Sequence, residues 1–331
     1  MTTAASHRYA GLAGSFLQRH GDEDEEEAAQ QRIGGLLSGW KRAMGERDGV
    51  MSREDGSDLR EDELRLPTLQ VSERSGATKD DPLTLVTPSQ QADHAILVYH
   101  NLMRGLDSMI VSDDRSEMRL HLSAEFVMIR ALIEAAGTAL WVLGPNSSDE
   151  RVLRSLRLRY TELTFSRKLA VTYADLAALR PGANANQLVA ETTVKESLEA
   201  QEAFVDGQME DLIKMASHAG IDRTKVTKAV SPSKIASDAG AYVPELGQAI
   251  SYWYWSTASS VAHSEPSNIQ TLADARFIGV DVRDRPIAHF EPSAVAIWNH
   301  LQAAHSMIEQ AHQLWNQRAA APKPTSPPTA S

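Results

Sequence analysis

The stretch LHLSAEFVMIRALIEAAGTALWVL, residues 120–143, decides the fold class. It is apolar nearly all round a helical wheel, and only Glu125, Arg130 and Glu134 interrupt it with charge. A membrane-spanning helix needs roughly 20 apolar residues, so these charges favour a helix buried in a protein core over a membrane anchor. Because an unpaired buried charge is costly, Arg130 and Glu134, one turn apart, should pair or meet partners from neighbouring helices.

The rest of the chain also has the composition of a helical protein. Of its 331 residues, 42% are hydrophobic and only 6% are aromatic, a balance that favours helices over sheets. Proline, which costs roughly 3 kcal/mol inside a helix, is missing from residues 89–144, 146–180, 182–231 and 293–321. We expect an all-α fold, a helical bundle of five to six long helices with a small β-hairpin, residues 277–282 and 286–290, before the last helix.

Changes in composition along the chain predict its division into segments. A run of acids, residues 22–27, precedes apolar residues at helical spacing, which predicts a short amphipathic helix. The central helix should begin at Asp113 or Asp114, since aspartate is a good helix cap. We predict an N-terminal arm with the short helix over residues 1–48, a disordered linker over 49–86, a helical-bundle domain over 87–318 and a disordered Pro-rich tail over 319–331.

The charge and the missing motifs exclude several classes of function. A formal net charge of −11 argues against a protein that coats DNA, which needs a broad basic surface. The absence of cysteine excludes disulfides and thiolate metal sites, and the first residues lack the apolar stretch of a signal peptide. The sequence has no phosphate-binding glycine loop, no Gly-x-Ser-x-Gly and no His-Glu-x-x-His. We therefore expect a cytoplasmic protein that uses no cofactor and binds no membrane.

One pattern in the last helix could suggest a metal. His305, Glu309 and His312 lie at helical spacing and include a Glu-x-x-His sequence, the form found in carboxylate-bridged di-metal sites. Such a site needs a second Glu-x-x-His, which the chain does not have. We therefore predict no metal site.

An arginine-rich helix is the first candidate binding element. Residues 150–168 carry six basic residues against two acidic ones, and Arg151, Arg154, Arg157 and Lys168 fall on one flank of a helical wheel. Arginine forks suit phosphates and carboxylates. The candidate ligand-binding residues are Arg151, Arg154, Arg157, Arg130 and Trp255. The alternative for the flank is a solvated helix face, or a dock for the acidic run 22–27.

The aromatic run 252–255 is the most distinctive segment of the chain. Four consecutive aromatic side chains cannot all face one core, so at least one should contact another element or a ligand. Trp255, Ser259 and His263 share one helical stripe, with His263 in the last turn. His263 either caps the helix carbonyls or acts in proton transfer or phosphate binding beside serine hydroxyls. The candidate catalytic residues are therefore His263, Ser259 and Glu134, the last as the anchor of a polar pocket.

The order of these features resembles uncharacterised actinobacterial helical-bundle proteins, which in turn look like distant members of the HEPN-like superfamily. The matching features are residues 129–134, 141–145, 150–154 and 255–263. That superfamily includes metal-independent ribonucleases of toxin and antiviral systems, which use an Arg-x4–6-His motif, and many members that only bind. Arg115 with His121 and Arg283 with His289 have the required spacing, whereas no arginine stands at that spacing before His263.

Three hypotheses of function remain open. The first is a non-catalytic helical module that binds a protein or an anionic ligand through the arginine-rich helix. The second is a HEPN-like ribonuclease of a toxin or antiphage-type system, with RNA as the partner, His263 or His121 moving protons and an arginine stabilising the phosphorane charge. The third is a subunit of a larger helical assembly, including a homo-oligomer.

Overall fold

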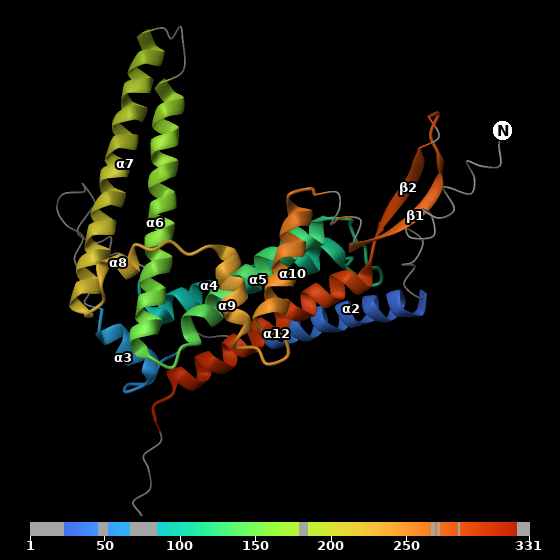
Figure 1. The fold of residues 1–331 in the computed structure, drawn as a ribbon, viewed down its shortest axis with the longest axis horizontal. Helices are drawn as coiled ribbons and strands as arrows, with labels where there is room; N and C mark the ends of the chain where they lie inside the picture. The colour runs from blue at the N-terminus through green and yellow to red at the C-terminus, as the bar shows by residue number, and fades with distance from the viewer. Residues whose placement is uncertain are drawn as a thin grey trace, which may run out of the picture. The chain divides into compact units, whose positions relative to one another are not determined.

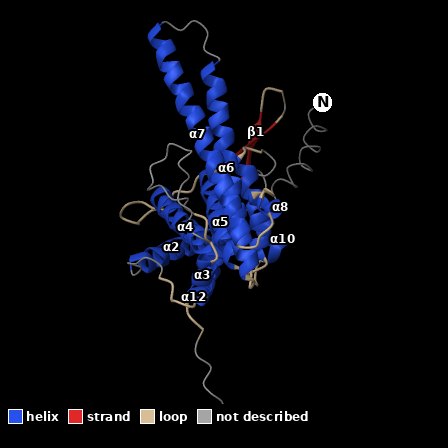
Figure 2. Ribbon diagram, turned by 90° about the vertical axis from the view of Figure 1, so that its left-hand side faces the viewer, coloured by secondary structure: helices blue, strands red, loops and turns tan. Residues whose placement is uncertain are grey.

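The computed structural model of the chain describes residues 23–45, 52–66, 85–178, 185–265, 269, 272–283 and 285–322. Helices make up most of this part of the chain, and the one sheet within it is a two-stranded hairpin directly before the last helix (Figures 1 and 2). The elements are α2 (Glu23–Gly45), α3 (Asp58–Leu64), α4 (Pro88–Ile110), α5 (Ala124–Leu143), α6 (Ser148–Ala178), α7 (Ala185–His218), α8 (Arg223–Val226), α9 (Pro232–Gly240), α10 (Gly247–Ala262), β1 (Ala273–Val280), β2 (Pro286–Pro292) and α12 (Ala294–Ala319). The predicted all-α fold with its β-hairpin is confirmed.

The chain forms two compact units, each assembled from segments far apart in the sequence. Unit 1 comprises residues 1–50, 95–138 and 233–310, and unit 2 comprises residues 51–94, 139–232 and 311–331. The sequence had predicted a single domain over residues 87–318. The difference arises because α6 and α7 bury apolar residues against each other and against α8, and so build a core within unit 2.

Helix α5 is the buried helix that the sequence predicts. Of its residues, all of which the structure describes, only Val127 is exposed. Within unit 1, Phe126, Ile129 and Leu132 are almost completely buried. By length and composition α5 is the one helix in the described part of the chain that could cross a membrane, and 67% of its apolar window is buried inside the protein.

The start of α5 lies ten residues later than predicted. Residues 111–123 form a loop with a single bridge between Val111 and Met118 instead of a helical turn. The Asp114 carboxylate accepts hydrogen bonds from the Ser112 hydroxyl and from both the amide and the hydroxyl of Ser116, which lower the pKa of Asp114 to about 2. These local bonds compete with helix formation, so the aspartate makes a turn and not a helix cap.

The predicted disordered linker over 49–86 contains a helix. Ser57 caps α3, because its hydroxyl accepts a hydrogen bond from the Arg60 amide, and Leu59 and Asp62 are fully buried. A helix of seven residues, most of them charged, is too short to show a hydrophobic period. Residues 49–51 and 67–84 of this segment lie outside the described residues, as do 1–22 and 46–48 of the N-terminal arm and 323–331 of the tail.

The predicted amphipathic helix is α2, and acidic residues form its first turn. Ala29, Ile33, Leu37 and Trp40 are buried along one stripe of α2. In the acidic first turn, Glu26 accepts hydrogen bonds from the Ala294 amide at 2.6 Å and the Ser293 hydroxyl at 2.8 Å. The carboxylate therefore caps the positive end of α12 within unit 1.

The core of unit 2 lies between α6 and α7, which run antiparallel as a helical hairpin (Figure 1). Arg167 of α6 pairs with Glu202 and Asp206 of α7, at 3.2 and 2.7 Å. The buried apolar residues of this core are Leu66, Val86, Val152, Leu156, Leu163, Val205, Leu212, Met215, Ala216 and Val226.

Candidate functional site

Three of the predicted site residues meet on the surface of unit 1. Arg130 Nε of α5 donates to Glu134 Oε1 at 3.0 Å, and Trp255 Nε1 of α10 donates to the same oxygen at 2.9 Å. The Arg130 guanidinium carbon lies 5.9 Å from the centre of the Trp255 ring, a cation–π contact. The predicted pairing of Arg130 with Glu134 is confirmed. The side chains of Arg130 and Glu134 are 27% and 31% exposed, so the pair lies at the surface of unit 1. Its contacts with Trp255 hold that ring at the same surface.

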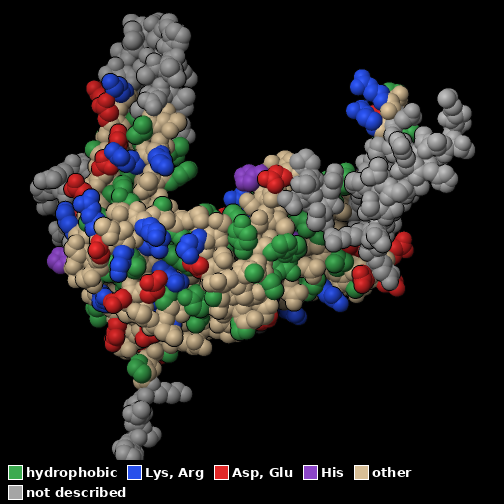
Figure 3. Space-filling model, viewed as in Figure 1, with side chains coloured by type: hydrophobic (Ala, Val, Ile, Leu, Met, Phe, Trp, Pro, Cys, Tyr) green, Lys and Arg blue, Asp and Glu red, His purple; other side chains and the backbone are tan. Residues whose placement is uncertain are grey.

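Beside this cluster, α10 presents large apolar side chains to solvent. Ile250, Tyr252 and Trp253 are each exposed by 46 to 49%. The Tyr252 ring lies 6.3 Å from that of Trp255, and the Trp253 ring lies 4.9 Å from that of Tyr254. Hydrophobic side chains gather on the visible surface near α10 and α12 (Figure 3). We refer to the side chains of Ile250, Tyr252, Trp253 and Trp255 together as the α10 aromatic face.

A buried histidine of α12 supports the α10 aromatic face from inside. His300 is 1% exposed, and its ring lies 4.8 to 5.6 Å from those of Phe126, Trp253 and Tyr254. Its Nδ1 donates to the Ala296 carbonyl at 2.8 Å, which leaves Nε2, 2.8 Å from the Thr257 hydroxyl, as the acceptor. Burial lowers the pKa of His300 to about 4, so the ring is neutral near pH 7 and packs as an aromatic residue.

His300 was missed by reasoning from the sequence, although a signal existed. It lies between Ile297 and Leu301, on the stripe of α12 that faces the core of unit 1. A histidine on such a stripe must be satisfied by buried partners. Only the fold shows that Thr257 of α10 is one of them.

Two of the predicted catalytic residues, Ser259 and His263, lie in different surroundings. Ser259 is buried, whereas His263 is exposed at the end of α10. The backbone amide of His263 bonds the Ser259 and Ser260 carbonyls, and Ser264 adopts a left-handed conformation with φ 60°. Backbone geometry therefore ends the helix, without the imidazole as a cap.

The two Arg-x5-His pairs differ in what their histidines contact. The His121 Nδ1 atom lies 2.9 Å from Oε1 of Glu125, whose carboxylate is fully buried. The same oxygen accepts a hydrogen bond from the His121 backbone amide at 2.8 Å. The partner of His121 in sequence, Arg115, is held by the Asp107 carboxylate and the Ser38 hydroxyl. In the other pair, His289 lies 3.5 Å from Glu291 on β2, and both side chains are more than half exposed.

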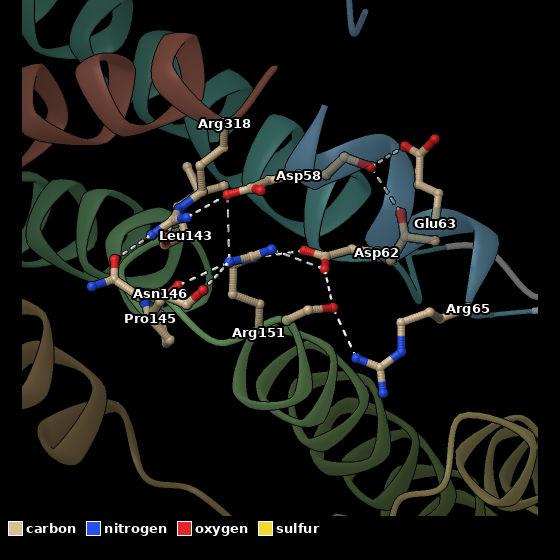
Figure 4. A network of polar contacts seen from close by, with 12 residues as sticks. Asp58, Asp62, Glu63, Arg65, Leu143, Pro145, Asn146, Arg151 and Arg318 are labelled. Atoms are coloured by element: carbon tan, nitrogen blue, oxygen red, sulfur yellow. Dashed lines mark hydrogen bonds and ion pairs between the residues drawn. The ribbon is translucent and has the colours of Figure 1, made fainter. Parts of the chain in front are cut away.

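In unit 2, the predicted ligand-binding residue Arg151 is buried, with 2% exposure. Figure 4 shows its guanidinium between Asp62 of α3 and the end of α5. Its Nε and Nη2 donate to the two oxygens of Asp62 at 2.6 and 3.0 Å, and Nη1 donates to the Pro145 and Asn146 carbonyls. The burial of Arg151 excludes a solvated helix face at this position. Its guanidinium is bound by protein groups at the carbonyl end of α5.

Other arginines complete the same arrangement. Arg154 donates to the Trp141 carbonyl and to Glu150, each at 2.8 Å, and its guanidinium lies 5.0 Å from the Trp141 ring. Arg318 donates to the Leu143 and Gly144 carbonyls and to Asp58 (Figure 4). The last carbonyls of a helix have no partner inside it, and here arginines satisfy them while Asp58 and Asp62 neutralise the charge.

Arg157 also contacts protein groups. Its Nε donates to the Lys228 carbonyl at 3.0 Å, and the guanidinium lies 5.7 Å from the Trp141 ring. With Arg151 and Arg154, it stabilises the end of α5 and the segment after α8. The three arginines of the predicted flank thus bind protein groups, whereas Lys168 of the same flank is exposed. The counter-charge of Arg151 comes from α3, which lies in a segment predicted to be disordered.

The pattern around Glu309 does not gather metal ligands. Within the described residues, no group of three or more His, Asp and Glu side chains is placed to hold a metal ion. His305 Nε2 lies 3.5 Å from Glu309, and burial lowers the pKa of His305.

Comparison of the chain with protein-family models, with curated proteins and with solved structures finds no match. The function must therefore be inferred from the geometry of the described residues.

Proposed function

We propose that this protein is a non-catalytic helical interaction module that binds a protein partner through the α10 aromatic face. The observation that carries the proposal is the exposure of Tyr252 and Trp253, consecutive residues of α10 that are each nearly half exposed. Trp and Tyr dominate the energetic centres of protein interfaces, and exposed apolar patches on soluble proteins mark interaction sites.

The support beneath these rings favours a binding surface over incidental exposure. Trp253 rests on the neutral His300 ring, and Trp255 is held by its bond to Glu134. Because these rings are fixed before a partner arrives, little conformational entropy is lost on binding. The arginine-rich helix is a weaker candidate, since Arg151 would have to leave a buried carboxylate to reach a ligand.

The experiment compares partner capture by the wild-type protein and a Tyr252→Ala/Trp253→Ala variant, with captured proteins identified by mass spectrometry. The double variant should lose the specific partner, because removing interface hot spots costs about 2 kcal/mol or more each, roughly 30-fold in affinity. Val282→Ala, which trims a fully exposed apolar side chain after β1, is the matched control.

A second pair of variants keeps this test decisive if the double variant is unstable. Tyr252→Arg places a charge on the exposed face without touching His300, and its unfolding transition should match that of the wild type. Equal capture of every partner by the wild type and by a folded Tyr252→Arg variant would contradict the proposal.

A metal-independent ribonuclease is a second candidate function, and the His121–Glu125 contact favours it. A carboxylate bound to Nδ1 orients the imidazole and leaves Nε2 to move a proton. RNA cleavage that persists in chelator, disappears in His121→Ala and survives in His263→Ala would establish it. Absence of cleavage by the wild type, or cleavage unchanged in His121→Ala, removes it.

A further inference from the structure

The charge around the α10 aromatic face narrows the chemistry of its partner. Helix α10 carries no charged residue of its own. Unit 1, to which α10 belongs, has 22 Asp and Glu residues against 14 Lys and Arg residues. Its formal net charge is therefore −8. Unit 2 has 22 acidic against 19 basic residues, so unit 1 carries most of the formal charge of −11.

The charged residue nearest to the start of α10 in the sequence has the same sign. Glu245 is exposed directly before α10. Arg130, a cation that contacts the Trp255 ring, is paired with Glu134 at 3.0 Å. An approaching partner therefore meets aromatic rings in a negative field.

The neighbouring Trp255 shows what such rings accept. The guanidinium of Arg130 lies on the Trp255 ring, with Glu134 as the counter-charge. The exposed Tyr252 and Trp253 rings offer the same kind of surface to a cation from outside, and a cation over an aromatic ring gains about 0.5–2 kcal/mol.

We infer that the partner presents a basic amphipathic segment, with apolar side chains on the α10 aromatic face and arginine or lysine beside Tyr252, Trp253 and Glu245. This inference rests on the proposed function and specifies its partner. Exposed aromatic rings could also stack on the bases of single-stranded RNA. RNA binding needs positive charge along the RNA backbone. The net negative charge of unit 1 therefore favours a basic protein segment over RNA.

The test uses two short fluorescein-labelled peptides with leucine on one helical face, and with arginine or glutamate on the other. Fluorescence anisotropy with the full chain should show binding of the arginine peptide and at least tenfold weaker binding of the glutamate peptide. Affinity for the arginine peptide should fall by at least tenfold in Tyr252→Ala/Trp253→Ala and by about threefold in Glu245→Gln, and it should weaken with added salt.

Glu25→Gln, which removes an exposed acid from α2 in unit 1, is the matched charge control. Equal losses in Glu25→Gln and Glu245→Gln would mean that the peptide follows the general field of unit 1, and the inference fails. It also fails if the glutamate peptide or a labelled single-stranded RNA binds more tightly than the arginine peptide.

The outcomes separate this inference from the proposed function. If the Tyr252→Ala/Trp253→Ala variant loses its captured partner while the arginine peptide does not bind at the face, the interaction module stands and the basic partner is wrong. If neither the partner nor the peptide depends on these rings, both proposals are wrong.

Discussion

Protonation of His300 should destabilise the protein as the pH falls below neutrality. The folded protein keeps this buried ring neutral down to about pH 4, whereas a histidine in the unfolded chain takes up its proton near pH 6.5. The unfolded state therefore binds more protons between these two values, so the stability is complete above pH 6.5 and is lost as the pH falls toward 4. At roughly 1.4 kcal/mol per pKa unit, the difference between the two pKa values corresponds to about 3 kcal/mol of stability. About 2 kcal/mol of this stability is lost by pH 5.

The assay is urea unfolding of the wild type and His300→Gln at pH 7 and at pH 5. Glutamine can still accept the Thr257 hydroxyl bond but does not titrate, so the variant should lose about 2 kcal/mol less than the wild type between the two pH values. His263→Gln is the control for an exposed histidine. Burial also lowers the pKa of His305, but His305 is present in the wild type and in both variants, so its contribution cancels in the comparison. Equal losses in wild type and His300→Gln would refute the reasoning that burial holds His300 neutral.

Three further substitutions each test a contact that lies within a single unit. Asp62→Ala leaves the buried Arg151 guanidinium without its counter-charge and should lower the free energy of unfolding by about 3–5 kcal/mol, measured by urea titration. Glu162→Ala, which removes the partly exposed partner of Arg159, is the control. A smaller loss of stability in Asp62→Ala than in Glu162→Ala would contradict this prediction. Glu26→Gln should cost about 1 kcal/mol through the weakened cap of α12, with Glu25→Gln as the control in the same turn. Gly240→Ala should lower the stability of unit 1 by about 1–3 kcal/mol, because a Cβ there would overlap Ser251 and the Gly247 carbonyl; a melting temperature equal to the wild type would show that α9 and α10 can move apart.

Local patterns in the sequence were sufficient to predict the class of fold. The apolar stretch of residues 120–143, the prolines between helices and the residues of the hairpin before the last helix are each local patterns, and each predicted its element. The pairing of Arg130 with Glu134 was predictable for the same reason, since both residues lie on one helix, one turn apart.

The partners of most site residues come from distant segments, and no local pattern reveals them. Arg151 pairs with Asp62, 89 residues away, and Trp255 with Glu134, 121 residues away. On a helical wheel, a buried arginine that caps carbonyls looks the same as an exposed one that binds phosphate. The short helix α3 was missed as well, and without it the counter-charge of Arg151 could not be placed.

Affinity for the captured partner, measured by calorimetry on purified proteins, tests most directly whether the α10 aromatic face, and not the arginine-rich helix, is the binding surface. Tyr252→Arg should lower the affinity for the partner by roughly 30-fold or more. Arg154→Ala should retain the wild-type affinity at a temperature where the variant remains folded. Full affinity in Tyr252→Arg, together with loss of affinity in folded Arg154→Ala, would contradict the account and return the binding site to the arginine-rich helix.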